Sequence, residues 1–349
     1  MMSPSTTVLD DERIAQLERE LQESRDNEQT SKAALRQVHQ DLKQAYLQVA
    51  QLKQKLDIVT KKLRSIQKSA DITAIAKRDI PSERKPAQES LPIPAKPSPH
   101  LRPLQEGEAA ARVNQLWQQR PSWTKGMILF NDTHFLDGLI REVHPDEVYE
   151  VGVASGTSSA LILSSMAAYS DPSKIWLHSW DITDTCYFDS ERAVGDATRA
   201  MVPHLLKQWK LSIGTALDVP RARDPKIKPL YFIDANHSHP WPTLDLIALL
   251  PALSPGDHVV LHDINLFASF GGEFPDFGVQ WLFEDWLGES IVPDVPLPNI
   301  GAIIIPEDKA VIRASLEKTL SRPWPLQMTT TDAHVLACEK CLADFLRDA

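Results

Sequence analysis

Four acidic residues stand at or near the ends of short apolar segments that have the pattern of β-strands. Glu150 lies within the first segment, and Asp181, Asp234 and Asp263 end three later ones. A single acid after a strand is often only a turn former or a helix cap. In an open parallel sheet, however, the carboxyl ends of the strands meet at one edge, where ligands bind. We therefore expect these carboxylates to converge on a ligand site.

The turn after the first segment is rich in glycine and serine. It reads Glu150-Val-Gly152-Val-Ala-Ser155-Gly156-Thr-Ser158. Glycine allows close approach of the backbone to a ligand, although small residues also help a helix to pack on a strand. The G-x-x-x-G spacing differs from the G-x-G-x-x-G of a dinucleotide site, and no G-K-[ST] of a phosphate-binding loop follows. The turn therefore disfavours a phosphate site.

The elements that position these residues alternate between short apolar segments and helical stretches. This alternation is typical of right-handed crossovers and of a mostly parallel sheet covered on both faces. The predicted fold class is α/β, with a doubly wound, mostly parallel sheet. Strands are expected near Glu147–Val153, Ile175–Asp181, Lys210–Ile213, Leu230–Asp234, His258–Asp263 and Ala302–Ile305. Helices are expected at Thr157–Tyr169, Ser190–Trp209, Thr243–Leu250 and Val279–Leu287.

This region resembles the class I S-adenosylmethionine-dependent methyltransferases. The acid-x-Gly-x-x-x-Gly turn that begins at Glu150 is similar to their first motif. The phrases YFIDANH at 231–237 and LSPGDHVVLHD at 253–263 resemble the branch with small-molecule and sugar O-methyltransferases and cephalosporin hydroxylase-like proteins. The resemblance spans about 130–306 and implies a Rossmann-like methyltransferase fold.

The resemblance also implies a binding site for S-adenosylmethionine along the first turn. The residues that would hold the methionine end are Glu150, Gly152, Ser155, Gly156 and Ser158. Asp181 would bind the ribose, because a carboxylate offers acceptors to both hydroxyl groups. Asp184 is an alternative, since the spacing of 31 positions from Glu150 to Asp181 exceeds the spacing of about 20 for the related acid in Rossmann folds. The positive sulfonium suits this acidic edge.

A metal site is implied by the acids of the two later strands. In several relatives such positions hold a divalent cation, so the expected ligands are Asp234, Asp263 and Asn265. Mg²⁺ is the expected ion because these ligands are oxygens, and it would bind the acceptor hydroxyl and ease its deprotonation. Asn236 and His262 stand where some metal-dependent relatives carry a second acid. A reaction without a metal therefore stays open.

Catalysis is assigned by the resemblance to His237 and Asp234. His237 matches the family's Asp-x-x-His phrase, and an imidazole can take the proton of a hydroxyl during methyl transfer. It can equally brace the loop through a hydrogen bond. The expected acceptor is a hydroxyl group of a small molecule or glycan. The expected reaction is an in-line displacement without a covalent intermediate.

Two other functions stay open at the level of sequence. In one, the protein is a non-catalytic scaffold whose α/β domain is a degenerate relative that binds a ligand or partner. The absence of a second acid beside Asp234 favours that interpretation, whereas the full first motif and Asp181 oppose it. An NAD-linked oxidoreductase would share the fold, but its glycine fingerprint is missing.

Composition narrows the class of partner. The 349 residues include 37 Lys+Arg and 47 Asp+Glu, which gives a net charge of -10. Without a basic patch, this charge disfavours nucleic acid and anionic membranes as partners. The chain has neither an apolar run of membrane-spanning length nor the pattern of a signal peptide, so we expect a cytoplasmic protein. The three cysteines, Cys186, Cys338 and Cys341, are too few for a disulfide framework.

A heptad pattern runs through the first part of the chain. Its a positions are Ile14, Leu21, Glu28, Leu35, Leu42, Val49, Leu56 and Leu63, and its d positions are Leu17, Ser24, Ser31, Val38, Ala45, Leu52, Val59 and Ile66. So narrow an apolar seam needs a partner helix. We therefore expect a coiled coil at 8–70 through which the chain self-associates, a proline-rich linker at 71–104 and a methyltransferase-like domain at 105–349.

Removal of the heptad segment tests its role in assembly. A chain that lacks residues 1–67 should sediment as a lower oligomer than the full chain, because it has lost the apolar seam. Analytical ultracentrifugation measures the mass of both. An unchanged stoichiometry would contradict assembly through this segment.

Overall fold

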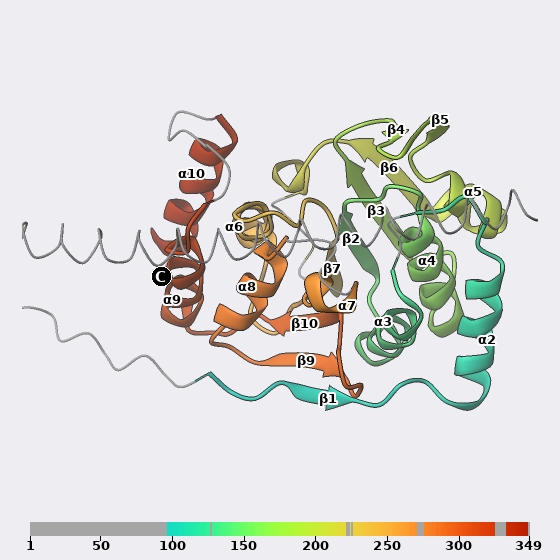
Figure 1. The fold of residues 1–349 in the computed structure, drawn as a ribbon, viewed down its shortest axis with the longest axis horizontal. Helices are drawn as coiled ribbons and strands as arrows, with labels where there is room; N and C mark the ends of the chain where they lie inside the picture. The colour runs from blue at the N-terminus through green and yellow to red at the C-terminus, as the bar shows by residue number, and fades with distance from the viewer. Residues whose placement is uncertain are drawn as a thin grey trace, which may run out of the picture. The chain divides into compact units, whose positions relative to one another are not determined.

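A central β-sheet organises the part of the chain that the computed structural model describes, namely residues 96–125, 128–220, 224, 226–270, 276–324 and 333–347. The predicted coiled coil at 8–70 and most of the predicted linker lie outside these residues. The sheet has the order β1-β9-β10-β8-β7-β2-β3-β6 (Figure 1). The strands are β1 (His100–Arg102), β2 (Glu147–Val151), β3 (Trp176–Asp181), β6 (Trp209–Ile213), β7 (Pro229–Ile233), β8 (His258–His262), β9 (Ser290–Pro293) and β10 (Ile300–Ile304).

The pairing within the sheet is mostly parallel. β2 pairs with β3 and β7, β3 with β6, and β7 with β8, all in parallel register. β10 runs antiparallel to β8 and β9. This arrangement confirms the predicted doubly wound α/β fold. It also places the carboxyl ends of β8, β7, β2 and β3 side by side.

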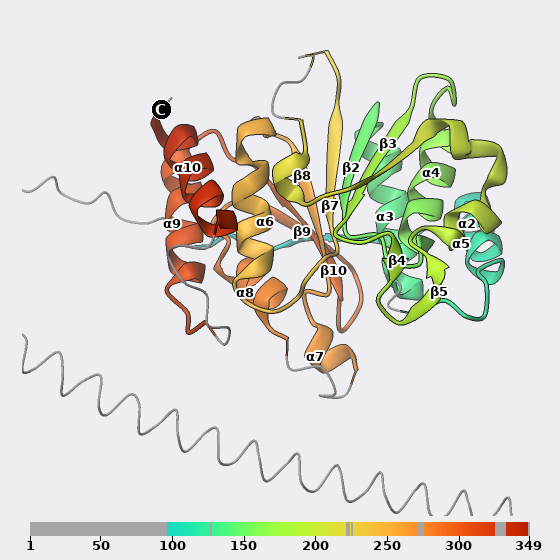
Figure 2. The ribbon, with the colours of Figure 1, turned by 90° about the horizontal axis from the view of Figure 1, so that it is seen from above.

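Helices cover both faces of the sheet, as the views along and across it show (Figures 1 and 2). One face packs on α2 (Gly107–Gln118), α3 (Phe130–Val143), α4 (Thr157–Tyr169) and α5 (Asp196–Met201). The other packs on α6 (Trp241–Leu249), α8 (Gly278–Asp285), α9 (Lys309–Leu320) and α10 (Ala333–Arg347). Each face therefore has its own apolar core, because alternate residues of a strand point to opposite sides.

The carboxyl edge of the sheet carries two further elements. A hairpin of β4 (Thr185–Cys186) and β5 (Asp189–Ala193) follows β3, and the short helix α7 (Leu266–Ser269) follows β8. Figure 2 shows both at the same end of the sheet. They border the edge at which the sequence predicts a ligand site.

One predicted helix is wrong. Residues 190–209 form the end of β5, helix α5 and a 3-10 helix at Pro203–Gln208 instead of a single helix. Gly195 precedes α5 with a φ of 79°, in the left-handed region that favours glycine. Pro203 cannot donate the backbone hydrogen bond that would continue α5. These two residues divide the segment.

The last residues of the predicted linker range belong to the sheet. β1 pairs in parallel with β9, and the ammonium group of Lys96 donates to the carbonyls of Phe283 and Glu284 at 2.8 and 3.0 Å. Arg102 forms an ion pair with Glu142. β1 is thus the edge strand that covers β9, and Lys96 ties the segment before it to the end of α8.

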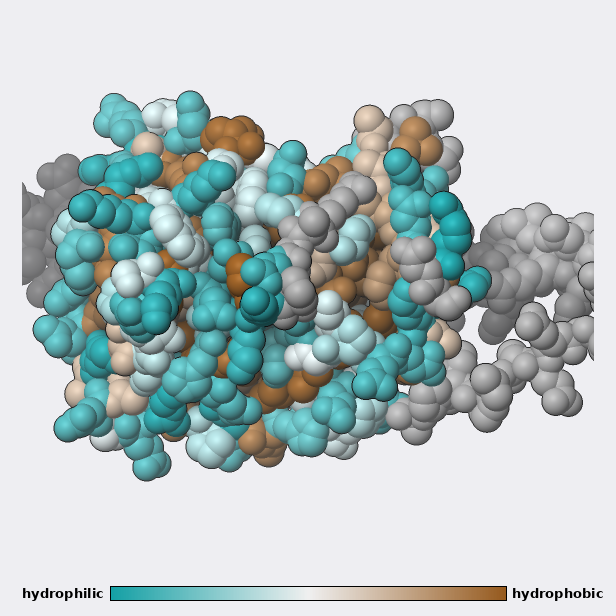
Figure 3. All heavy atoms as spheres, turned by 180° about the vertical axis from the view of Figure 1, so that it is seen from behind, coloured by the Kyte–Doolittle hydropathy of each residue, from teal (hydrophilic) through white to brown (hydrophobic). Residues whose placement is uncertain are grey.

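Polar and charged side chains predominate on the face seen in Figure 3, with apolar side chains scattered among them. No helix among the residues that the structure describes has the length and apolarity needed to cross a membrane.

Loss of the edge strand should weaken the sheet. A chain that starts at residue 105 should melt roughly 5 °C below one that starts at residue 96, because a few ladder hydrogen bonds of about 1 kcal/mol each disappear. Differential scanning calorimetry of both chains measures the difference. Equal melting temperatures would mean that β1 adds no stability.

Candidate functional site

The turn between β2 and α4 lies at the centre of the carboxyl edge, between the ends of β3 and β7. The carboxylate of Asp181, at the end of β3, accepts hydrogen bonds from the backbone N–H groups of Val153 and Ala154, both at 3.0 Å. Asp181 remains partly exposed. Asp184 is exposed and lies at the start of the hairpin. Of the two acids considered for the ribose, Asp181 is the one in contact with the turn.

Glu150 lies beneath the turn in the interior of the protein. Its carboxylate accepts hydrogen bonds from the hydroxyls of Ser158, Ser159 and Ser179 at 2.6 to 2.7 Å. Burial raises the pKa of Glu150 to about 7, although the three hydroxyls favour the ionised form. Glu150 and Ser158, both predicted to bind the cofactor, are therefore bonded to each other. They support the turn from inside.

Two glycines allow the turn to pack closely. A β-carbon on Gly152, which has a φ of 91°, would lie 2.1 Å from the carbonyl oxygen of Asp234. One on Gly156 would lie 2.3 Å from the hydroxyl of Thr198. Ser155 is buried, with its hydroxyl 3.2 Å from that of Thr157. The turn is thus held in direct contact with the loop that carries Asp234.

Asp234, His237 and Asp263 form a cluster next to this turn. Nε2 of His237 lies 3.4 Å from Oδ1 of Asp234 and 3.1 Å from Oδ2 of Asp263. One potential ligand atom from each residue lies within 4.8 Å of the others, which suits a bound metal ion. His237 is the most accessible of the three, at 26% side-chain exposure against 12% and 8% for Asp234 and Asp263.

His262 and Asp132 extend this cluster into the core. Nδ1 of His262 lies 3.0 Å from Oδ1 of Asp234, and its Nε2 lies 3.2 Å from Oδ2 of Asp132. Burial opposes a charge on His262, but Asp234 and Asp263 outweigh it and raise the pKa of His262 well above its usual value. Burial likewise opposes ionisation of Asp234 and Asp263, and the charge on His262 nevertheless lowers the pKa of both.

Asn265, predicted as a metal ligand, points elsewhere. Its amide nitrogen donates to the carbonyl of Pro298 at 2.6 Å. Asn299 instead donates to Oδ1 of Asp263 at 2.6 Å, and Asp263 adopts a φ of 63°. The structure therefore brings His237, and not Asn265, to the two acids. No motif in the sequence identifies Asp132 or Asn299, whereas His262 stands directly before a predicted ligand.

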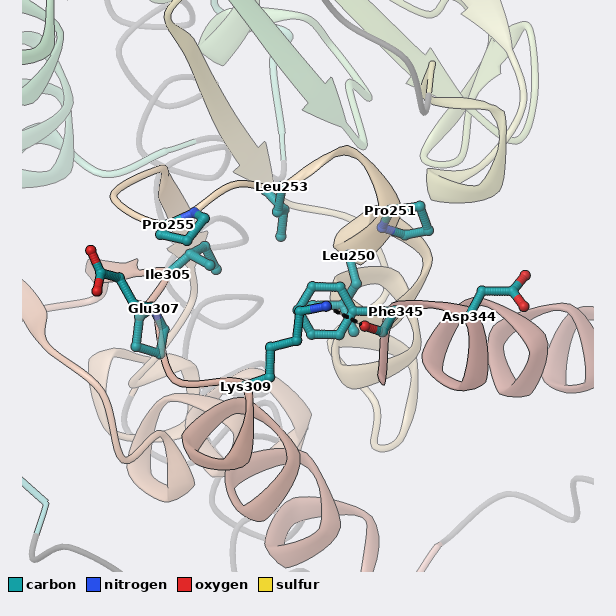
Figure 4. Close-up of a pocket in the computed structure, with 10 residues that line it drawn as sticks. Leu250, Pro251, Leu253, Pro255, Ile305, Glu307, Lys309, Asp344 and Phe345 are labelled. Carbon is teal, nitrogen blue, oxygen red and sulfur yellow. Dashed lines mark hydrogen bonds between the residues drawn. The ribbon is translucent and has the colours of Figure 1, made fainter. Parts of the chain in front are cut away.

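An apolar pocket elsewhere in the fold contains none of the predicted site residues. Its apolar lining includes Leu250, Leu253, Ile305 and Phe345, and Glu307, Lys309 and Asp344 also border it (Figure 4). Lys309 donates to the carbonyl of Phe345 at 2.6 Å. Leu253 precedes β8 and Ile305 follows the antiparallel β10. The pocket therefore lies at the amino end of the parallel strands, away from the cluster.

Residues 149–264 match a family model described as a methyltransferase domain. The matched segment begins in β2, contains the turn and ends one residue after Asp263. The match agrees with the predicted methyltransferase resemblance, and this segment of the chain is a methyltransferase domain. None of the curated proteins matches the chain significantly.

Two solved structures are similar to part of the chain. The O-methyltransferase TomG from Streptomyces achromogenes, in complex with S-adenosylmethionine, is 19% identical and covers 58% of this chain and 92% of its own, with a TM-score of 0.38. An O-methyltransferase from Bacillus cereus is 15% identical and covers 57% and 92%, with a TM-score of 0.37.

Replacement of Glu150 should change how stability depends on pH. An acid with a raised pKa in the folded state loses stability as pH rises from the unfolded pKa, near 4.5, to the folded one, near 7. Between pH 4 and pH 8, the wild type should therefore lose up to roughly 3 kcal/mol relative to Glu150→Gln. Urea unfolding at a series of pH values measures this difference. Glu289→Gln, at an exposed position, should parallel the wild type, and parallel curves for Glu150→Gln would disprove the effect of burial.

Proposed function

We propose that this methyltransferase domain uses S-adenosylmethionine to methylate a hydroxyl group of a small molecule or glycan. The observation that carries the proposal is the position of the Asp234, His237 and Asp263 cluster, in contact with the glycine-containing turn through Gly152. A methyl donor held along the turn would lie next to the groups that orient and deprotonate an acceptor.

The proposed cofactor site runs from the turn to the end of β3. One carboxylate oxygen of Asp181, Oδ2, accepts both hydrogen bonds from the turn. Because a carboxylate has about four acceptor positions, Asp181 can still accept hydrogen bonds from ribose hydroxyls. Ile182, which follows Asp181, is 78% exposed and offers an apolar surface to a flat base. The negative charges of Asp181 and Asp234 favour a positively charged sulfonium over an anionic phosphate.

The cluster fits a divalent cation. Asp234 and Asp263 would hold the ion, which when bound would polarise the acceptor hydroxyl and ease its deprotonation. Both carboxylates keep their orientation through neighbours, since His262 contacts Asp234 and Asn299 donates to Asp263. We expect Mg²⁺ or Mn²⁺, because oxygen ligands suit both ions.

His237 is assigned to the proton of the acceptor hydroxyl. It is the cluster residue with the greatest exposure, and its Nε2 faces both acids. The methyl donor supplies an electrophilic carbon, so the protein needs only to align the hydroxyl oxygen with it and remove one proton. His237 could serve instead as a third metal ligand, since its Nε2 belongs to the same group of atoms.

The acceptor would enter beside the β4–β5 hairpin. Tyr187, at the tip of this hairpin, is exposed. An acceptor that enters here would pass this side chain on its way to the cluster. Self-association through residues 8–70 and a cytoplasmic location stay predictions from the sequence.

Two substitutions should separate cofactor binding from turnover. Asp181→Ala should weaken S-adenosylmethionine binding at least about tenfold, because hydrogen bonds to a charged group are lost. Asp263→Ala should keep cofactor binding and lose turnover. Isothermal titration calorimetry with S-adenosylmethionine, and with NAD as the control ligand, measures binding. Failure of the wild type to bind S-adenosylmethionine would favour the scaffold function, and NAD binding would favour the oxidoreductase.

A third substitution distinguishes the two roles of His237. If His237 accepts the proton, His237→Gln should lose at least about a hundredfold in kcat while its affinity for Mn²⁺ stays near that of the wild type. Electron paramagnetic resonance titration of free Mn²⁺ measures this affinity. A loss of Mn²⁺ affinity would identify His237 as a metal ligand. An unchanged kcat together with an unchanged Mn²⁺ affinity would exclude both roles.

A further inference from the structure

Asp132 is a buried acid that reaches the cluster through His262. It lies in the first turn of α3 and has 2% side-chain exposure. Its Oδ2 accepts from the backbone N–H of Leu129 at 3.3 Å and lies 3.2 Å from Nε2 of His262. A buried carboxylate is costly unless it has such partners.

His262 connects this acid to the proposed catalytic carboxylates. It ends β8 and has 4% side-chain exposure, so its ring is fixed by packing. Its Nδ1 lies 3.0 Å from Asp234 and 3.4 Å from Asp263, while its Nε2 is taken by Asp132. The contacts form a continuous chain from α3 through β8 to the loop after β7.

We propose that Asp132 and His262 are positioning residues that hold the carboxylate of Asp234 in its working orientation. The inference rests on the proposed function, because it assigns a task to these two residues in that same site. Asp132 fixes the orientation of the imidazole ring, and Nδ1 of that ring holds Oδ1 of Asp234, the oxygen that also faces His237. Hydrogen-bond partners behind metal-binding groups commonly set the affinity of a site in this way.

A second buried acid of α3, Asp137, stabilises the packing of helices and does not contact the cluster. Asp137 accepts hydrogen bonds from Arg112, Ser165 and Tyr169 at 2.5 to 2.8 Å. These partners lie on α2 and α4, and they join three helices to one another. Asp132 differs because its chain of contacts ends on Asp234. The same helix thus offers a matched control.

The test compares Asp132→Asn with Asp137→Asn in the full chain. Asp132→Asn should weaken Mn²⁺ binding by about 10- to 100-fold and lower kcat, while the affinity for S-adenosylmethionine stays unchanged. Asp137→Asn should lower the melting temperature and leave Mn²⁺ binding and kcat near the wild-type values. Mn²⁺ titration by electron paramagnetic resonance, calorimetry with the cofactor and the melting temperature are measured for each variant.

Two results would overturn the inference. One is wild-type Mn²⁺ affinity and kcat in Asp132→Asn, and the other is an equal loss of both in Asp137→Asn. If Asp132→Asn does not fold, His262→Gln takes its place. It keeps an N–H donor but not the fixed ring, so the same losses are expected. If the wild type is active without Mn²⁺, the comparison of kcat between Asp132→Asn and Asp137→Asn alone tests the inference. A wild type that binds neither Mn²⁺ nor the cofactor would contradict the proposed function itself.

Discussion

The fold brings two carboxylates, Asp234 and Asp263, to the ends of neighbouring strands where little water reaches them. Burial and mutual repulsion both oppose their ionisation. The charge on His262 offsets these effects and keeps the pKa of both acids low. The site therefore depends on one buried imidazole that allows two buried acids to stay charged side by side, where a cation or a polarised hydroxyl can bind.

The strand order makes this cluster part of one unit with the turn after β2. β2 lies between β3 and β7, so the turn has Asp181 on one side and Asp234 on the other. Asp181 holds its backbone from outside, Glu150 supports it from inside, and Gly152 lets it touch the Asp234 loop. A ligand that binds along the turn cannot be far from the cluster.

The acids of this edge could be predicted because strand ends follow from apolar periodicity and parallel topology. The partners of those acids could not. Asp132 lies 130 residues from His262 in the sequence, and only the packing of α3 brings them together. His237, predicted as catalytic, belongs to the cluster, whereas Asn265, predicted as a metal ligand, does not, because its amide is bonded to Pro298. The predicted helix at 190–209 is divided at Gly195 and Pro203, and the sequence shows both of these residues.

The central claim is that the turn and the cluster together bind a methyl donor and a cation. A crystal structure of the full chain with S-adenosylhomocysteine and Mn²⁺ tests it most directly, with data collected at the manganese absorption edge. We expect an anomalous peak in contact with Asp234 and Asp263, and the cofactor product along the turn with its ribose on Asp181. A peak elsewhere, or a product bound away from the turn, would contradict the account.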